Sequence, residues 1–324
     1  MPPSSPLGRV LDASIVFSFD ASGFRRHARG FDDPDIDVDL TGRLCLITGA
    51  NSGLGYATAL ALARRGARVQ LLCRSAERGT QALQDIRQQS GNPEVELRIL
   101  DLSSLASVDR FTTELEDEPI DVLVHNAGVL PATRQITDDG LELCLQTNLV
   151  GPFVLTARLW PLLAKAPAPR IVHVSSGGMY ARRLDLHALE GIHGAYDGVV
   201  AYAHTKRAQV VISELLAARL RPRGIAVHCM HPGWADTPGV RSSIPRFWKA
   251  TRGILRTPEQ GADTITWLAA VDLDLNESGK FWFDRKARDT HLLPGTRETQ
   301  EQRGALWMAL IRWARLEADT KPWP

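Results

Sequence analysis

The 324-residue chain has few cysteines, and none of them stands in a disulfide or metal-binding pattern. Cys45, Cys73, Cys144 and Cys229 lie far apart, without a CxxC pair. Three of them fall in apolar runs of strand type, where a cysteine behaves as a small hydrophobe. The sequence therefore predicts neither a disulfide framework nor a zinc site, and it favours a reducing compartment.

The chain also lacks an excess of charge and a long apolar run. Lys and Arg total 38 against 37 for Asp and Glu, which gives a formal net charge of +1. Such a balance does not attract nucleic acid or an anionic membrane. The apolar runs fall short of the ~18 residues of a spanning helix, and the N-terminus shows no leader pattern. We expect a cytoplasmic protein with a small-molecule partner, no nucleic acid and no transmembrane segment, and leave a homo-oligomer open.

A glycine-rich stretch connects an apolar run with a helical pattern between Arg43 and Ala63. Leu44–Ile47 suits a buried parallel strand, and Tyr56–Ala63 has apolar residues at helical spacing. Glycines let the backbone turn tightly and approach a ligand, and the N-terminus of the following helix favours an anion. The stretch therefore predicts a binding site for a dinucleotide pyrophosphate. Its residues are Thr48, Gly49, Asn51, Ser52, Gly53, Leu54 and Gly55.

From Arg43 onward, strand patterns alternate with helix patterns. The predicted strands cover 43–48, 68–73, 95–100, 120–125, 170–175, 225–230 and 280–284. The predicted helices cover 53–65, 76–90, 104–117, 139–164 and 201–221. This order predicts an α/β fold of Rossmann type, a doubly wound parallel sheet of about seven strands with helices on both faces. We expect an N-terminal extension with a short helix (1–40), a dinucleotide-binding catalytic domain (41–293) and a C-terminal helical tail (294–324).

Polar residues follow several predicted strands, at the sheet edge where the ligand of such a fold lies. Arg74 follows the second strand, where an acidic residue would otherwise bind a ribose 2′-hydroxyl. A guanidinium suits a 2′-phosphate, so the sequence favours NADP(H), with NAD(H) as the alternative cofactor. A solvated surface arginine is the other interpretation of this position. Later strand ends carry Asp101, Leu102, His125, Asn126, Ala127, Gly128, Ser175 and Ser176.

Tyr202 and Lys206 lie four residues apart in the predicted helix 201–221, and therefore on one helix face. Tyrosine with its usual pKa of ~10 is a poor acid-base group near neutral pH, but an adjacent ammonium lowers that pKa. Only six of the 38 basic residues are lysines, so Lys206 indicates a need for a compact ammonium. A chance pair on an amphipathic helix is the alternative interpretation.

These motifs together resemble the short-chain dehydrogenase/reductase family. They are TGxxxGxG at 48–55, HNAG at 125–128, the serine pair at 175–176 and YxxxK at 202–206. SSGGM at 175–179, HPGWADTPGV at 231–240 and QGADT at 260–264 extend the resemblance from about residue 12 to 293. His125 departs from the usual Asn of the family, and we expect this to affect packing more than chemistry.

The resemblance implies roles for further residues. Ser176, chosen over Ser175, would bind the substrate oxygen, and Asn148 would hold a water that relays protons to Lys206. Tyr202 and Lys206 would also contact the cofactor. Asp101 would lie near the adenine. Other expected cofactor contacts are Leu102, Asn126, Ala127, Gly128, Pro232, Gly233, Trp234 and Thr237.

The expected function is an NADP(H)-dependent oxidoreductase acting on an apolar or lipid-like alcohol or carbonyl compound. Residues from about 178 to 200 and 234 to 257 are predicted to wall its substrate pocket, with Arg182, Arg183 and Arg246 at the rim. The alternative function is a catalytically silent dinucleotide-binding sensor or scaffold. The predicted apolar wall residues are Met179, Tyr180, Leu184, Leu186, Trp234, Ile244, Phe247 and Trp248.

Overall fold

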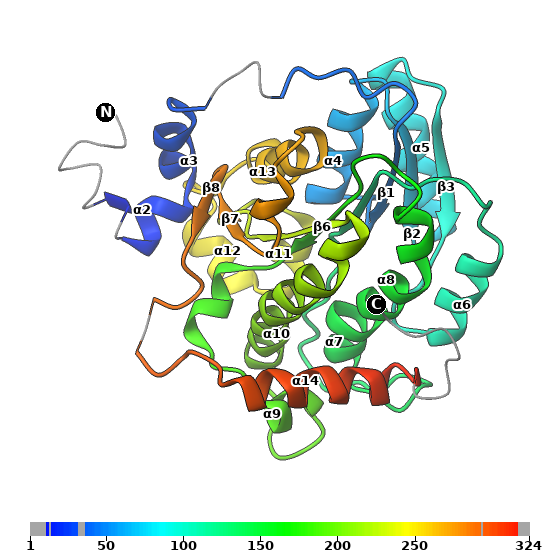
Figure 1. Ribbon diagram of the computed structural model, residues 1–324. Helices are drawn as coiled ribbons and strands as arrows, with labels where there is room; N and C mark the ends of the chain where they lie inside the picture. Colours follow the sequence, from blue (N-terminus) through cyan, green and yellow to red (C-terminus); the bar gives the residue numbers. More distant parts are fainter. Residues whose placement is uncertain (1–10, 13, 32–35, 293, 317–324) are drawn as a thin grey trace.

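A computed structural model describes residues 11–12, 14–31, 36–292 and 294–316. Its centre is an eight-stranded sheet (Figure 1) in the order β3-β2-β1-β4-β5-β6-β7-β8. Neighbouring strands are parallel except β7 and β8. The strands are β1 (Leu44–Thr48), β2 (Arg68–Cys73), β3 (Val95–Ile99), β4 (Val122–His125), β5 (Arg170–Val174), β6 (Ala226–Met230), β7 (Phe281–Phe283) and β8 (Lys286–Arg288).

Helices cover both faces of the sheet, as Figure 1 shows. The α4, α5 and α13 helices share one buried apolar core with the sheet. The α6, α8, α10 and α14 helices share the core on the other face. These helices are α4 (Gly53–Ala63), α5 (Ala76–Ser90), α6 (Leu105–Thr113), α8 (Gly151–Leu163), α10 (Gly198–Leu220), α13 (Pro258–Ala270) and α14 (Gln300–Trp313). The predicted Rossmann-type α/β fold is therefore confirmed, with β8 as an additional antiparallel strand.

The strand order reverses between β1 and β4, so the two halves of the sheet diverge at this point. In open α/β sheets a ligand binds beyond the carboxyl ends of the strands at such a reversal. The glycine-rich turn after β1 and the segment after β4 both lie there. The topology thus positions the two sequence motifs side by side.

Three predicted segments differ from the structure. The helix predicted over 139–164 begins only at α7 (Leu143–Leu145), because Thr137 N donates to Leu141 O at 2.9 Å in a preceding turn. A π-helical turn (Gln146–Val150) then leads into α8. The helix predicted over 104–117 ends at Thr113. The segment from about 178 to 200, predicted as a pocket wall, contains a helix outside the predicted set, α9 (Leu186–Glu190).

The N-terminal extension contains two short helices where one was predicted. They are α2 (Ile15–Phe19) and α3 (Ala21–Ala28), and Asp20 joins them by accepting a hydrogen bond from Gly23 N at 2.8 Å. Figure 1 places them beside β8 and α12 (Pro245–Thr251), which follows α11 (Pro238–Ser243). Residues 32–35 of the predicted extension lie outside the described residues. Within the described part of the chain, no helix has the length and apolar character to cross a bilayer.

Candidate active site

A cleft of about 490 Å³ lies beyond the carboxyl ends of β1, β2 and β4. It brings together thirteen of the predicted cofactor-binding residues and adds Ser75, Arg78, Val129 and Thr147. Mixed backbone amides, small residues and arginines suit a nucleotide more than an apolar ligand. The predicted residues that line it are Thr48, Gly49, Asn51, Ser52, Gly53, Leu54, Arg74, Asp101, Leu102, Asn126, Ala127, Gly128 and Thr237.

The glycines of the turn serve two different purposes. Gly49 and Gly53 have φ values of +67° and +57°, which side chains rarely allow. Gly55 has no such constraint, but a Cβ there would lie 2.5 Å from both Asn126 Nδ2 and Gly49 O. Gly55 therefore permits close packing behind the turn, and it does not itself line the cleft among the described residues.

Thr48 and Asn126 bind the ends of β1 and β4 together. Thr48 Oγ1 accepts hydrogen bonds from Asn126 N and Ala127 N, each at 3.0 Å. Asn126 Nδ2 donates to Thr48 O at 3.0 Å and to Gly49 O at 3.3 Å. These bonds fix the floor of the cleft.

Two arginines stand at the end of the cleft that follows β2. Arg74 and Arg78 both line it, and Ser75 caps α5 by accepting a hydrogen bond from Arg78 N. Both guanidinium groups are exposed and have no ion-pair partner among the residues that the structure describes. Sequence reasoning found Arg74 and missed Arg78, although an arginine one helical turn further on was a usable signal.

Asn148 is positioned by the π-helical turn and holds the segment after β4. Its Oδ1 accepts from Val129 N at 2.8 Å, and its Nδ2 donates to Val129 O at 3.0 Å. Nδ2 also contacts Cys144 Sγ and Thr205 Oγ1, at 3.0 Å and 3.2 Å. Its carboxamide is thus engaged with protein partners, and the predicted relay water stays a prediction. Sequence reasoning missed Cys144 and Thr205, which have no distinctive pattern.

Gly128 connects the cleft with the predicted catalytic residues. A Cβ at Gly128 would lie 3.4 Å from Asn148 Oδ1 and 3.5 Å from Lys206 Nζ. Lys206 is 2% exposed, and its Nζ donates to Val174 O at 2.8 Å. The lysine ammonium therefore lies directly behind the wall of the cleft.

The Ser176 hydroxyl lies beside the Tyr202 phenol. Burial raises the pKa of Tyr202 to about 12, and the nearby Ser176 hydroxyl offsets only part of this rise. Burial also lowers the pKa of Lys206 to about 8. The predicted lowering of the tyrosine pKa is thus wrong for this site. Lys206 Nζ lies 5.3 Å from the Tyr202 ring centroid and bonds the Val174 carbonyl instead, so desolvation dominates.

The two neighbouring serines have different environments. Ser175 is buried, and its hydroxyl donates to Lys206 O at 2.9 Å. Ser176 begins a 3₁₀ turn (Gly177–Ala181) and faces Tyr202. Ser175 therefore fastens α10 to the sheet, while Ser176 presents a hydroxyl beside the phenol.

The turn after β6 lies only partly at this cleft, so the cofactor contacts predicted for Pro232, Gly233 and Trp234 stay a prediction. Pro232, Gly233 and Trp234 are not among the described residues that line the cleft, whereas Thr237 is. A Cβ at Gly53 would lie 3.2 Å from Thr237, so Thr237 closes over the glycine-rich turn. The Pro232 carbonyl instead accepts from Arg256 Nη1 at 3.2 Å.

The predicted apolar walls divide into two groups. Met179 is 0% exposed and packs in a core cluster with Phe281, and Leu184 lies in the main core, so neither walls a pocket. Leu186 packs against the same core, and Tyr180 OH donates to Asp289 O at 3.2 Å. Of the other predicted wall residues, Trp234 and Phe247 form an edge-to-face pair at 5.2 Å, and Ile244 and Trp248 are partly exposed nearby on α11 and α12.

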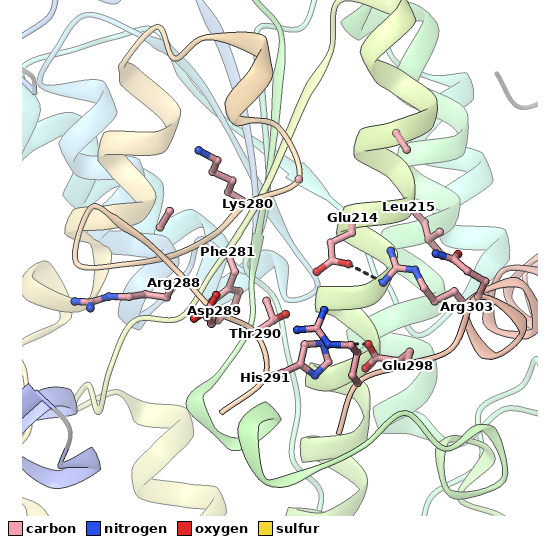
Figure 2. A pocket seen from close by; sticks show the side chains of 15 residues that line it. Glu214, Leu215, Lys280, Phe281, Arg288, Asp289, Thr290, His291, Glu298 and Arg303 are labelled. Carbon is pink, nitrogen blue, oxygen red and sulfur yellow. Dashed lines mark hydrogen bonds and ion pairs between the residues drawn. The ribbon is translucent and has the colours of Figure 1, made fainter. Parts of the chain in front are cut away.

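A larger cavity of about 970 Å³ lies away from these motifs, between α10, β7 and the start of α14 (Figure 2). Two ion pairs lie at or beside this cavity. Arg303 bonds Glu214 at 2.7 Å, and buried Arg207 pairs with Glu298 at 2.6 Å. Figure 2 shows the Glu214 carboxylate pointing toward the Arg303 guanidinium. The first pair connects α14 with α10, and the second connects α10 with the segment before α14.

Comparison with known proteins gives the same family as the motifs. The family model for short chain dehydrogenase matches residues 43–246. Bovine dehydrogenase/reductase SDR family member 12 is 43% identical over 275 residues, which cover 84% of this chain and 86% of that protein. Human retinol dehydrogenase 11 is 38% identical over 263 residues, covering 78% of this chain and 82% of that protein.

A solved structure extends the likeness to the fold. A short chain dehydrogenase from Escherichia coli, complexed with NADPH, has a TM-score of 0.60 and 26% identity, and the match covers 77% of this chain and 99% of that one. The family match and the two relatives decide the classification. The chain belongs to the short-chain dehydrogenase/reductase family, whose members are oxidoreductases acting on alcohol and carbonyl groups.

Proposed function

We propose that this protein transfers a hydride between NADP(H) and an apolar, lipid-like alcohol or carbonyl compound, with Tyr202 as the acid-base group. The observation that carries the proposal is the convergence at Gly128. A nucleotide-sized cleft there adjoins Lys206 Nζ and Asn148 Oδ1, while the Ser176 hydroxyl at the end of β5 lies beside the Tyr202 phenol on α10. A protein that only binds the dinucleotide would not need Ser176 and Tyr202 in this arrangement.

The residues divide the reaction as follows. NADP(H), when bound, supplies or accepts the hydride. Ser176 binds the substrate oxygen, and the Tyr202 hydroxyl donates its proton to that oxygen in the direction of reduction. Lys206 donates a hydrogen bond to the Val174 carbonyl and so holds α10 against the end of β5. A neutral phenol is the required acid for reduction, and a pKa of about 12 keeps Tyr202 in that form.

The cofactor preference is supported by Arg74 and Arg78, which line the cleft beside the end of β2 and have no ion-pair partner in the described part of the chain. Each charge-assisted bond to a 2′-phosphate is worth about 1.5–3 kcal/mol, or roughly 10- to 100-fold in affinity. Arg74→Ala and Arg78→Ala should weaken NADPH binding by about that factor and leave NADH binding unchanged. Arg110→Ala, an exposed arginine on α6, is the control. Equal wild-type affinities for the two cofactors would contradict the preference.

The apolar substrate is supported by Trp234 and Phe247 near the site, and by a relative named retinol dehydrogenase 11. A panel of long-chain, aromatic and retinoid-like carbonyls, with small polyols for comparison, should be followed by nicotinamide absorbance. Turnover of the polyols alone would refute this substrate class. Cofactor binding without turnover of any compound would favour the silent sensor or scaffold instead.

Tyr202→Phe removes only the phenolic oxygen and tests the acid-base assignment. NADPH affinity and folding should stay near wild type, while the rate with the best substrate falls by about 10²–10⁴. Tyr56→Phe is a matched control, because the Tyr56 hydroxyl on α4 bonds Gln89 and faces away from the cleft. Retention of most activity by Tyr202→Phe would exclude it as the proton donor.

A further inference from the structure

The N-terminal helix α2 ends against the segments that follow β5 and β6. Phe19 is 8% exposed, and its ring lies 4.5 Å from His231 and 6.2 Å from Trp234, measured between centroids. A Cβ at Gly177 would lie 2.5 Å from Phe19 Cε2. Trp234 N donates to Phe19 O at 2.8 Å. Phe19 therefore fills the space between the turn after β6 and the segment that carries Ser176.

Arg256 joins α2 to that same turn. Its side chain is 1% exposed, and every N–H of its guanidinium has an acceptor. Nε donates to Phe19 O at 2.9 Å and to Asp20 O at 3.2 Å, and Nη2 donates to Ser18 O at 2.9 Å. Nη1 donates to Pro232 O at 3.2 Å. One side chain thus holds the last carbonyls of α2 and the first carbonyl of the turn.

Asp284 balances the charge of Arg256 and extends the contact to α3. Its two oxygens accept from Arg256 Nη1 at 2.6 Å and Nη2 at 2.9 Å. The Oδ2 atom also contacts His27 Nδ1 at 2.6 Å, and His27 Nε2 contacts Asp12 at 2.7 Å. The Asp284 carboxylate lies in the turn between β7 and β8, where Asp284 and Arg285 have positive φ angles of 50° and 55°. This pair matches the two-residue hairpin turn that fits the twist of the strands.

We propose that Arg256 is a positioning residue, which anchors the turn Pro232–Trp234 to the N-terminal helices and thereby holds the segment that leads into Thr237 at the cleft. The N-terminal segment is then a component of the catalytic unit. This inference rests on the proposed function, because the turn matters for catalysis only where a nicotinamide binds. Gly233 has φ +74°, and a Cβ there would lie 2.4 Å from Arg256 Nε, so the turn is fitted closely around this guanidinium.

Lysine cannot replace Arg256 in this role. An ammonium has three donors on one atom, whereas the guanidinium has five donors in a planar fork. Arg256→Lys keeps the charge opposite Asp284 and leaves several buried carbonyls without a donor. Arg170→Lys is the matched control. Arg170 is equally enclosed and bonds the Ala168 carbonyl and Asp272, but it lies at the opposite end of β5.

The test compares hydrogen exchange in the full-length wild type, Arg256→Lys, Phe19→Ala and Arg170→Lys. Exchange over residues 231–237 should become at least about tenfold faster in the first two variants and stay unchanged in Arg170→Lys. Phe19→Ala leaves the ion pair between Arg256 and Asp284 in place. If Arg256→Lys does not fold, Phe19→Ala is therefore compared with the wild type in its stead. Unchanged exchange over 231–237 in the folded Arg256 and Phe19 variants, or an equal change in Arg170→Lys, would overturn the anchoring.

A second measurement separates positioning from simple stability. NADPH affinity and kcat/KM should fall by at least about tenfold in Arg256→Lys, with no such fall in Arg170→Lys at a similar loss of Tm. Faster exchange without any loss of NADPH affinity would overturn the positioning role. A wild-type protein that binds no nicotinamide dinucleotide would refute the proposed function instead, and the exchange comparison decides the anchoring in either case.

Discussion

His173 should make the folded protein sensitive to mild acid. It lies in β5 at 1% exposure, and neither ring nitrogen has a hydrogen-bond partner among the described residues. Its ring centroid is 4.7 Å from that of His125. Burial, with a smaller effect of the Lys206 charge, lowers the pKa of His173 from 6.5 to about 3. The folded protein therefore keeps this imidazole neutral where the unfolded chain protonates it.

The sign follows from proton uptake. Between about pH 6.5 and pH 3 the unfolded state binds more protons at His173, so the free energy of unfolding falls as the pH decreases. Each pH unit below the unfolded pKa is worth about 1.4 kcal/mol, so His173 alone costs about 2 kcal/mol at pH 5. His228 and His231 act in the same direction, because burial lowers their pKa values to about 4 and about 3.

Urea unfolding at pH 7 and pH 5 measures this effect. The drop in unfolding free energy between the two pH values should be about 2 kcal/mol smaller in His173→Gln than in the wild type. His187→Gln, at an exposed histidine of α9, should show the wild-type drop. If His173→Gln loses as much stability as the wild type between pH 7 and pH 5, the assignment of a neutral buried imidazole is wrong.

Two further predictions concern the other titrating groups. Because the pKa of Tyr202 is raised to about 12, carbonyl reduction should vary little between about pH 6 and 7.5, while alcohol oxidation rises with a slope approaching tenfold per pH unit. Parallel slopes in both directions would exclude Tyr202 as the titrating group. Burial raises the pKa of the Cys45, Cys144 and Cys229 thiols to about 12, and of Cys73 to about 11. A thiol reagent should therefore modify none of them in the native protein at neutral pH and all of them in urea, and rapid labelling of native protein would contradict their burial.

The sheet could be predicted from the sequence because its parallel strands are buried on both faces. Such strands are short apolar runs between helical patterns, as in β1, where every residue is buried. By contrast, β8 contains Lys286 and Arg288 and is only three residues long. No periodicity identifies a strand of that kind. It forms because the turn at Asp284 and Arg285 folds the chain back along β7.

Most of the cleft could also be predicted. Its residues lie in short motifs directly after the strands, and in a parallel sheet the carboxyl ends of the strands lie at the same edge. The start of the helix near Leu143 could not be predicted, because Leu141 has helical spacing to Leu145 and Leu149 while its carbonyl accepts from Thr137 N in a preceding turn. Met179 and Leu184 were misassigned to the pocket because an apolar side chain after a strand suits a wall and a core equally well. Only the tertiary packing separates the two.

Lys206 and Arg256 are both buried cations, and the sequence indicated the first of them but not the second. Lys206 is one of few lysines, lies in a motif, and has a pKa lowered to about 8, so it is a group whose charge responds to its surroundings. Arg256 is one of many arginines, and its contact with Phe19 spans 237 residues of sequence. Arginine stays charged in proteins and offers five donors, which suits a fixed anchor for several carbonyls. The Lys206 ammonium bonds the single Val174 carbonyl, whereas the Arg256 guanidinium serves four carbonyls and a carboxylate, so the number of buried acceptors accounts for the residue type at each place.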